Sequence, residues 1–261
     1  MILGADSISF SSNKISILRN LNIQVNVGEC IAIVGPNGAG KSTFLNLLAN
    51  EIESGERKKI HVKEKPLPKW TFTELSIHKS KFSQHNSNDI PLLVDDVVLM
   101  GCYPYFDSKP TTEDLQIVEK IMHETDISHL QKRDYNTLSG GEKQRVHLAR
   151  AFVQLENSIE HKMMFLDEPL NNLDVRHQYK TLHLIIDFVK RGNAAIVVPH
   201  DLNLAAQFAD RIFLMKNGEM VAEGTPDDVF QSERISEVYN FPCTICKNPI
   251  NNNPLILFGE M

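Results

Sequence analysis

The chain has 261 residues, with 42% hydrophobic and 23% charged side chains, which is ordinary for a globular protein and excludes disorder as the dominant state. Acidic residues outnumber basic ones by 33 to 27, so the net charge is −6, which argues against nucleic acid as the main partner. No apolar run approaches the length of about 18 residues that suggests a transmembrane helix, and the N-terminus does not resemble a signal peptide. We therefore expect a cytoplasmic chain that reaches a membrane only through a partner.

The first third of the sequence predicts strands and one helix. Residues 22–27 alternate polar and apolar side chains, and residues 30–34 form an unbroken apolar run that is typical of a central buried strand. A glycine-rich loop and a helix over about 42–50 follow. Residues 55–90 are polar and carry few strong patterns.

The middle of the chain predicts helices, and strands return after it. Residues 112–124 and 141–155 carry apolar side chains at helical spacing. Strands are expected at 163–166 and 194–198, with a helix over 174–190 between them, which predicts a parallel sheet. Residues 211–222 predict a hairpin around an Asn-Gly turn.

A phosphate-binding loop is predicted directly after the buried strand. Residues 35–42 fit the pattern Gly-x4-Gly-Lys-Ser, in which glycines let backbone N–H groups surround phosphate and the following helix adds its positive end. Lys41 is expected to reach the β- and γ-phosphates, and the Ser42 hydroxyl to bind Mg²⁺. A chance glycine-rich turn is the alternative, which the flanking strand and helix disfavour. The predicted ATP-binding residues are Gly35, Pro36, Asn37, Gly38, Ala39, Gly40, Lys41, Ser42 and Thr43.

Two acidic residues end the apolar strand that begins at residue 163. Asp167 suits the Mg²⁺ shell through water, and Glu168 is placed to polarise the attacking water. Acids after a strand are common, and it is the combination with the phosphate loop that makes this pair a catalytic candidate.

A second candidate anion site opens the helix near residue 140. A serine and two glycines stand at its predicted N-terminus, in the segment 138–145. One chain needs one such cradle for one triphosphate, so we expect this one to bind the γ-phosphate held by another copy. The alternative is an ordinary capped helix, with Ser139 and Glu142 as a capping box.

Over essentially its whole length, the sequence resembles the ABC-transporter ATPase family. Residues 35–43 look like its Walker A motif, 138–145 like its signature motif, 163–168 like its Walker B motif and 171–174 like its D-loop. The resemblance implies roles for the following residues: Glu168, the Q-loop Gln84 and the switch His200 in catalysis; Ser42, Gln84 and Asp167 at the metal; Ser139, Gly140, Gly141 and Glu142 at the partner's ATP; and Asp174 in the D-loop.

The resemblance also implies a fold, cofactors and partners. The fold is α/β: a P-loop NTPase with a RecA-like core, an antiparallel β subdomain and an inserted α-helical subdomain. The whole chain would be one ATP-binding domain, with residues 1–85 and 158–261 as core and 86–157 as the helical part. ATP and Mg²⁺ are the implied cofactors. The implied partners are a second copy in a head-to-tail dimer, a transmembrane permease dimer and, indirectly, a periplasmic solute-binding protein. The implied place is peripheral, on the cytoplasmic face of the inner membrane.

The sequence departs from the family at several positions. The aromatic residue that often stacks on adenine falls near Ser12, with Phe10 as the nearest aromatic side chain. Residues 171–172 are Asn-Asn where the family usually has Ser-Ala, and Pro199 precedes His200. Residues 243–246 form a lone Cys-x-x-Cys, which we interpret as packing residues, since the two sulfurs would point to opposite faces of a strand.

Within the family, segments 84–87, 97–105 and 200–206 look like the branch that serves iron-siderophore, heme and cobalamin uptake. A polar stretch at 156–162 and the tail 239–258 are similar to hemin-importer ATPases, although a variable surface loop also explains the polar stretch. We therefore expect hemin import, with siderophore or cobalamin uptake as the alternative. A non-transport ABC ATPase usually has long coiled coils or tandem nucleotide domains, and a P-loop kinase would leave the segment 138–145 unexplained.

Overall fold

A computed structural model describes residues 1–83, 92–106 and 108–259 of the chain. Its central sheet has the strand order β10-β9-β3-β8-β7-β6, in which β6, β7, β8, β3 and β9 run parallel and β10 is antiparallel. The strands are β3 (Cys30–Val34), β6 (Lys79–Phe82), β7 (Met163–Asp167), β8 (Ala194–Val198), β9 (Arg211–Lys216) and β10 (Glu219–Gly224). The expected parallel sheet and the hairpin after residue 210 are confirmed.

The continuous apolar runs are explained by burial of the central sheet on both faces. In β3, Cys30, Ala32 and Val34 join one hydrophobic cluster, while Ile31 and Ile33 join another. Because successive side chains of a strand point to opposite faces, a strand covered on both sides needs an apolar residue at every position. Strands β7 and β8 divide their side chains between the two clusters in the same way.

A smaller antiparallel sheet covers one of these faces. Its strand order is β2-β1-β4-β5, and the strands are β1 (Leu3–Ser12), β2 (Ile15–Val25), β4 (Ile60–Val62) and β5 (Lys65–Pro66). Helix α1 (Lys41–Leu48) packs in the same hydrophobic cluster, between this sheet and the central one. The C-terminal residues form a separate hairpin of β11 (Cys243–Lys247) and β12 (Pro254–Phe258).

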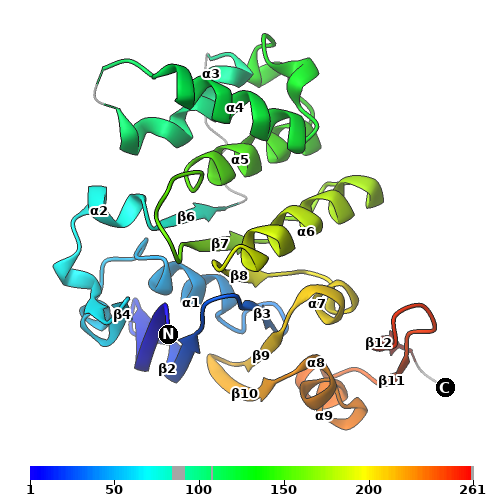
Figure 1. Ribbon diagram of the computed structural model, residues 1–261. Coiled ribbons are helices and arrows are strands. Elements are labelled where there is room, and N and C mark those ends of the chain that lie inside the picture. Colours follow the sequence, from blue (N-terminus) through cyan, green and yellow to red (C-terminus); the bar gives the residue numbers. More distant parts are fainter. Residues whose placement is uncertain (84–91, 107, 260–261) are drawn as a thin grey trace.

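Helices α3, α4 and α5 form a group at one end of the molecule, with α5 lying closest to the sheet in Figure 1. The remaining helices connect strands of the core or follow them. The helices are α2 (Phe72–Ser76), α3 (Val94–Leu99), α4 (Thr112–Glu124), α5 (Gly140–Val153), α6 (Val175–Lys190), α7 (Leu202–Phe208), α8 (Pro226–Val229) and α9 (Ser232–Tyr239). Among the described helices, none is long and apolar enough to cross a membrane.

The parallel strands place the candidate residues at one edge of the sheet. The glycine-rich loop follows β3, the acidic pair ends β7, and His200 follows β8. In open parallel sheets, ligands bind beyond the carboxyl ends of the strands, so the topology brings these three segments to the expected binding edge. Gln84, the first residue beyond the described stretch that ends at 83, lies outside the described residues.

Candidate ATP-binding and hydrolysis site

The loop between β3 and α1 has a backbone that glycine is needed to form. Gly35, Gly38 and Gly40 have φ values of 149°, 81° and 95°, in the region that favours glycine. A Cβ at Gly35 would lie 2.1 Å from the carbonyl oxygen of Met215, and one at Gly40 would lie 2.7 Å from a methyl group of Leu18. The loop is therefore closely packed against its neighbours as well as tightly curved.

The ammonium group of Lys41 lies inside this loop. Its Nζ donates hydrogen bonds to the carbonyl oxygens of Gly35 at 2.8 Å and Pro36 at 3.0 Å. Burial lowers the pKa of Lys41, while the nearby carboxylates of Glu168 and Asp167 act in the opposite direction. A cation held by two backbone carbonyls can transfer to a phosphate that enters the loop, since a phosphate oxygen offers a stronger, charge-assisted bond.

The first turn of α1 contacts the end of β7. The Ser42 hydroxyl donates a hydrogen bond of 3.0 Å to Oδ1 of Asp167. Burial raises the pKa of Asp167, and this hydrogen bond partly offsets the shift. A hydroxyl and a carboxylate oxygen at this spacing form a donor set that fits Mg²⁺, which prefers oxygen ligands.

Glu168 is held in a defined conformation. Its φ of 51° lies in the left-handed region, and its N–H donates to the carbonyl of Val198 on β8 at 2.9 Å. The side-chain amide of Asn171 donates to Glu168 Oε2 at 2.5 Å. The buried amide of Gln144 on α5 donates to the Pro169 carbonyl at 2.7 Å, which fixes the next peptide. The acidic pair thus contacts both β8 and α5.

Helix α5 starts with the capping box that the sequence offered as the alternative to an anion site. The Ser139 hydroxyl accepts from the N–H of Glu142, and the Glu142 carboxylate accepts from the N–H of Ser139 at 2.8 Å. Hydrogen bonds from the N–H and the hydroxyl of Ser139 to this carboxylate lower the pKa of Glu142. A Cβ at Gly140 would meet no atom within 4 Å, whereas one at Gly141 would lie 2.8 Å from the carbonyl oxygen of Asn172. The start of α5 therefore packs against the segment 171–174 of the same chain.

The remaining predicted residues lie at element boundaries. Asp174 caps α6, and its carboxylate accepts from the N–H of His177 at 2.9 Å. His200 is exposed after β8, and Thr43 lies in α1. Phe10, in β1, is half-buried against the hydrophobic cluster beneath the small sheet.

The two C-terminal cysteines lie on opposite faces of β11, as expected. The Cys243 sulfur packs toward α9, 3.4 Å from the Ser236 hydroxyl, whereas Cys246 is exposed. No group of three or more His, Cys, Asp or Glu side chains that could hold a metal occurs within residues 1–83, 92–106 and 108–259.

Two residues that help to shape the site were given no role from the sequence. Gln144 lies inside the segment quoted for the signature motif, and its burial at 6% exposure was not foreseen. Asn171 was noted only as a departure from the family. An amide at this position, three residues after a predicted catalytic carboxylate, is the signal that could have indicated its hydrogen bond.

The site has a glycine-rich loop between a buried strand and a helix, a lysine in that loop and an acidic pair on another strand of the sheet. These features together define a P-loop nucleoside-triphosphate-binding protein.

Comparisons with known proteins narrow this class of protein. The family model described as "ABC transporter" matches residues 18–171. The chain is 38% identical over 257 residues to the "Hemin import ATP-binding protein HmuV" of Vibrio parahaemolyticus, covering 98% of this chain and 97% of that protein. A protein of the same name from Escherichia coli O157:H7 is 38% identical, with 99% and 100% covered.

Solved structures have the same fold. An inward-facing protein described as a metal-chelate type ABC transporter matches with a TM-score of 0.80 at 23% identity, covering 99% of this chain and 97% of that one. The ADP conformation of the ATP-binding cassette MJ1267 matches with a TM-score of 0.76 at 23% identity, covering 92% and 98%. The chain belongs to the ABC transporter family. It is an ATP-binding subunit that hydrolyses ATP to drive transport. An ATPase of this family works with a second nucleotide-binding subunit and a transmembrane permease.

Proposed function

We propose that this chain powers hemin uptake by hydrolysing Mg²⁺-bound ATP at the edge of the central sheet. In this proposal residues 35–43 hold the triphosphate, and Lys41 moves its ammonium group from the loop carbonyls to the β- and γ-phosphates. Ser42 and Asp167 would hold Mg²⁺, with Gln84 as a further ligand. When bound, Mg²⁺ would neutralise the negative charge that develops on the phosphates during cleavage. The contact between Ser42 and Asp167 at 3.0 Å supports this assignment.

Glu168 is the proposed general base, and His200 is proposed to contact the γ-phosphate. The hydrogen bond from Asn171 to Oε2 orients the Glu168 carboxylate that is proposed to accept a proton from water. Because this bond and the Val198 contact fix both the side chain and the backbone, Glu168 needs little rearrangement when the substrate binds.

Two copies are proposed to enclose two ATP molecules head to tail. Within one chain, Ser139 is hydrogen-bonded to Glu142, and Lys41 to the carbonyls of Gly35 and Pro36. The N-terminus of α5 presents Ser139, Gly140 and the positive end of the helix, which suit a phosphate. In the dimer these groups would complete the ATP site of the partner subunit.

We also propose that the core comprises residues 1–85 and 158–261 and the helical part residues 86–157.

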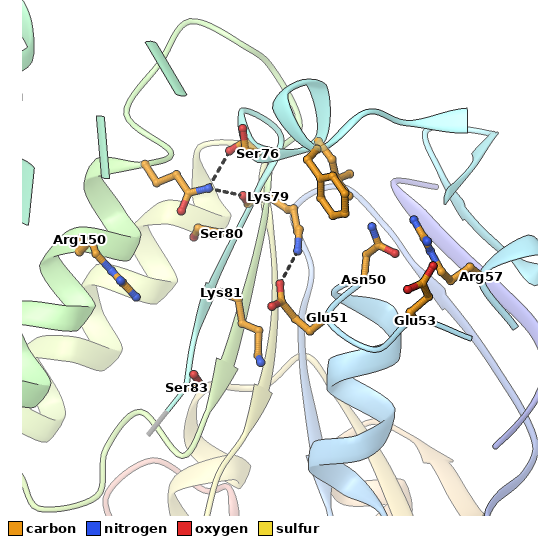
Figure 2. A pocket seen from close by; sticks show the side chains of 13 residues that line it. Asn50, Glu51, Glu53, Arg57, Ser76, Lys79, Ser80, Lys81, Ser83 and Arg150 are labelled. Carbon is orange, nitrogen blue, oxygen red and sulfur yellow. Dashed lines mark hydrogen bonds and ion pairs between the residues drawn. The ribbon is translucent and has the colours of Figure 1, made fainter. Parts of the chain in front are cut away.

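A groove at the border between the core and the helical group is the proposed permease-docking site. The groove has a volume of about 740 Å³ and lies among the segment after α1, helix α2, strand β6 and helix α5 (Figure 2). Its lining includes Glu51, Arg57, Phe72, Lys79, Ser80, Arg150 and Gln154.

The chemistry of this groove suits a protein segment that carries both apolar and polar groups. Phe72 is 80% exposed at the groove, which is unusual for a large apolar side chain. The Ser80 hydroxyl is buried and has no hydrogen-bond partner among the described residues, and Arg150 lines the groove on the same side (Figure 2). Glu51 is already paired with Lys79 at 2.8 Å. A permease segment seated here would contact the core and the helical group at the same time.

Replacing Phe72 with Asp tests this docking site. The variant should lose co-purification with the permease and lose transport, while its ATP hydrolysis without permease stays unchanged, because Phe72 lies outside the nucleotide site. Ile250, 92% exposed at the turn between β11 and β12, offers a matched control as Ile250→Asp. Co-purification of the Phe72 variant at the level of the control variant would contradict docking in the groove.

Hemin is proposed as the cargo because the similarity to hemin import proteins extends over nearly the whole chain. The Vibrio vulnificus protein of that name is 40% identical over 251 residues, covering 96% of this chain and 94% of that protein. A periplasmic solute-binding protein would deliver the cargo to the permease, and this chain would act at the cytoplasmic face of the inner membrane.

Transport assays with the complete importer test the cargo. Proteoliposomes that contain this chain and its permease, with the binding protein supplied, should accumulate hemin when ATP is present on the side of this chain. A ferric siderophore and cobalamin should not be accumulated. Uptake of either compound in preference to hemin would overturn the cargo assignment while leaving the ATPase assignment in place.

A further inference from the structure

A side-chain bridge through a histidine joins the start of α6 to the turn after α4. The ring of His177, with only 14% of its side chain exposed, has Nδ1 at 2.9 Å from both carboxylate oxygens of Asp174. Its Nε2 lies 3.1 Å from Oδ2 of Asp126, in the turn that follows α4. One imidazole therefore contacts carboxylates from two parts of the chain that lie about 50 residues apart in the sequence.

Both ring nitrogens of His177 thus lie within hydrogen-bond distance of a carboxylate. Because ionised carboxylates only accept hydrogen bonds, the ring is the donor in these contacts. The contact with His177 holds the pKa of Asp126 low, and hydrogen bonds from the N–H and ring of His177 lower the pKa of Asp174. Arg176 and Lys180 on α6 and Arg145 on α5 are the other charged groups close to these carboxylates.

The bridge continues toward the catalytic carboxylate. Asp174 ends the loop 169–174, which contains Asn171, the residue that donates to Glu168. Gln178, one residue beyond His177, donates to the Leu170 carbonyl at 3.3 Å. The turn after α4, the start of α6, the loop and Glu168 thus form one contiguous set of contacts.

We propose that His177 is a positioning residue for ATP hydrolysis, which ties the loop 169–174 to the turn after α4. A shift of the helical group when ATP binds or the permease moves would then be transmitted through Asp126, His177 and Asp174 to the loop that orients Glu168. This inference rests on the proposed roles of Glu168 and the loop; it adds the residue that couples them to the helical group.

Replacing His177 with Gln provides the first test, because both donors of glutamine are on a single nitrogen, which cannot occupy the positions of both ring nitrogens. The kcat for ATP hydrolysis should fall by about 3- to 30-fold, the range expected for a residue that transmits coupling. The KM for ATP should change less than about twofold, since no atom of the phosphate loop is touched. His183, exposed on the same helix, provides the matched control as His183→Gln, which should leave kcat unchanged.

A double-mutant cycle with Asp126→Asn separates coupling from independent effects. Asp126 has a φ of 60°, and asparagine tolerates this conformation as well as aspartate, so the change removes charge without straining the turn. Asp126→Asn alone should also lower kcat, and the double variant should be no slower than His177→Gln.

A wild-type kcat in His177→Gln, or losses that multiply in the double variant, would overturn the inference. If His177→Gln fails to fold, a wild-type kcat in Asp126→Asn alone would overturn it. Glu168→Gln is measured alongside: normal turnover in that variant would refute the proposed site itself rather than the bridge.

Discussion

The side-chain amide of Asn171 donates a hydrogen bond of 2.5 Å to Oε2 of Glu168. Asn171 stands where related ATPases usually carry serine, so a difference from the family motif coincides with a direct contact to the proposed general base. The asparagine side chain is longer than that of serine, and its amide reaches the carboxylate of Glu168, three residues earlier in the chain. The contact orients the carboxylate that is proposed to accept a proton from water.

Removing this donor should slow hydrolysis. Asn171→Ala is expected to lower kcat by about 10-fold, since a hydrogen bond to a charged group contributes roughly 1.5–3 kcal/mol and part of it is replaced by water. Asn171→Ser, which keeps a donor, should lose less. Steady-state ATP hydrolysis with saturating ATP measures both, and equal activity of Asn171→Ala and wild type would show that the contact has no catalytic role.

The adjacent glycines at the start of α5 should respond differently to the same substitution. In Gly141→Ala the new methyl group would lie 2.8 Å from the Asn172 carbonyl oxygen, so thermal unfolding should occur at a lower temperature. In Gly140→Ala the methyl group meets open space, and alanine favours the helix, so stability should be unchanged or slightly higher.

ATP hydrolysis by the same two variants separates an effect on stability from an effect on function. If Gly140 faces the ATP of the partner subunit, Gly140→Ala should lose hydrolysis despite its intact fold. Differential scanning calorimetry and ATP hydrolysis on the same preparations give both results. A fully active Gly140→Ala would contradict the proposed place of this residue at the partner's phosphate.

The composite site can be tested by complementation. Lys41→Ala and Ser139→Arg should each abolish hydrolysis alone, because one variant lacks the phosphate cation and the other blocks the second cradle. A mixed dimer would combine both defects in one site and leave the other site intact. Mixing the two variants should therefore restore part of the activity, measured after exchange of differently tagged subunits.

Crosslinking provides the control for this experiment. In a Glu168→Gln background with exposed Cys246 replaced by serine, Asn37→Cys in one chain should crosslink with Ser139→Cys in the other when ATP is added. Crosslinks confined to single chains would exclude the head-to-tail arrangement.

The buried His147 predicts a stability loss in acid. Its ring Nε2 lies 2.7 Å from the Tyr135 hydroxyl oxygen, and burial, helped by the charges of Arg150 and Lys143, lowers its pKa to about 4. In the unfolded chain the pKa of His147 has its ordinary value of about 6.5. Between about pH 6.5 and 4, the unfolded chain therefore binds more protons at this histidine than the folded chain does. The stability that neutral His147 provides is present above about pH 6.5 and decreases as the pH falls through this window.

Replacing His147 with Gln should reduce that acid sensitivity. The free energy of unfolding of wild type, relative to the variant, should decrease by up to roughly 3 kcal/mol between pH 7 and pH 4. Urea unfolding at several pH values measures it. A difference between the two proteins that does not change with pH would refute the assignment of this titration to His147.

The local elements with strong patterns could be predicted from the sequence. The apolar runs at 30–34 and 163–166 and the helix at 112–124 are set by neighbours in the chain, and the structure confirms them. The capping box at 139–142, the alternative to an anion site, is present and is also a local feature. Strand β6 was not predicted: it lies at the edge of the sheet, where Lys79 and Lys81 alternate with Ser80 and Phe82 and leave only a short, polar pattern.

Contacts between distant segments could not be predicted in the same way. The hydrogen bond from Gln144 to the Pro169 carbonyl and the bridge from Asp126 to His177 join residues 25 and 51 positions apart. Such pairs depend on how the helical group packs on the core, and the sequence contains no periodicity that reports it. The glycine at 141 is explained only once the Asn172 carbonyl is seen against it.

The most direct test of the account is ATP binding and hydrolysis by Glu168→Gln. Loss of a general base slows the chemical step by about 10²–10⁴-fold, whereas the phosphate loop and Lys41 are unchanged. Calorimetry should therefore show ATP affinity close to that of wild type, and phosphate release should be nearly abolished. Turnover close to wild type would contradict the assignment of Glu168 and, with it, the proposed site.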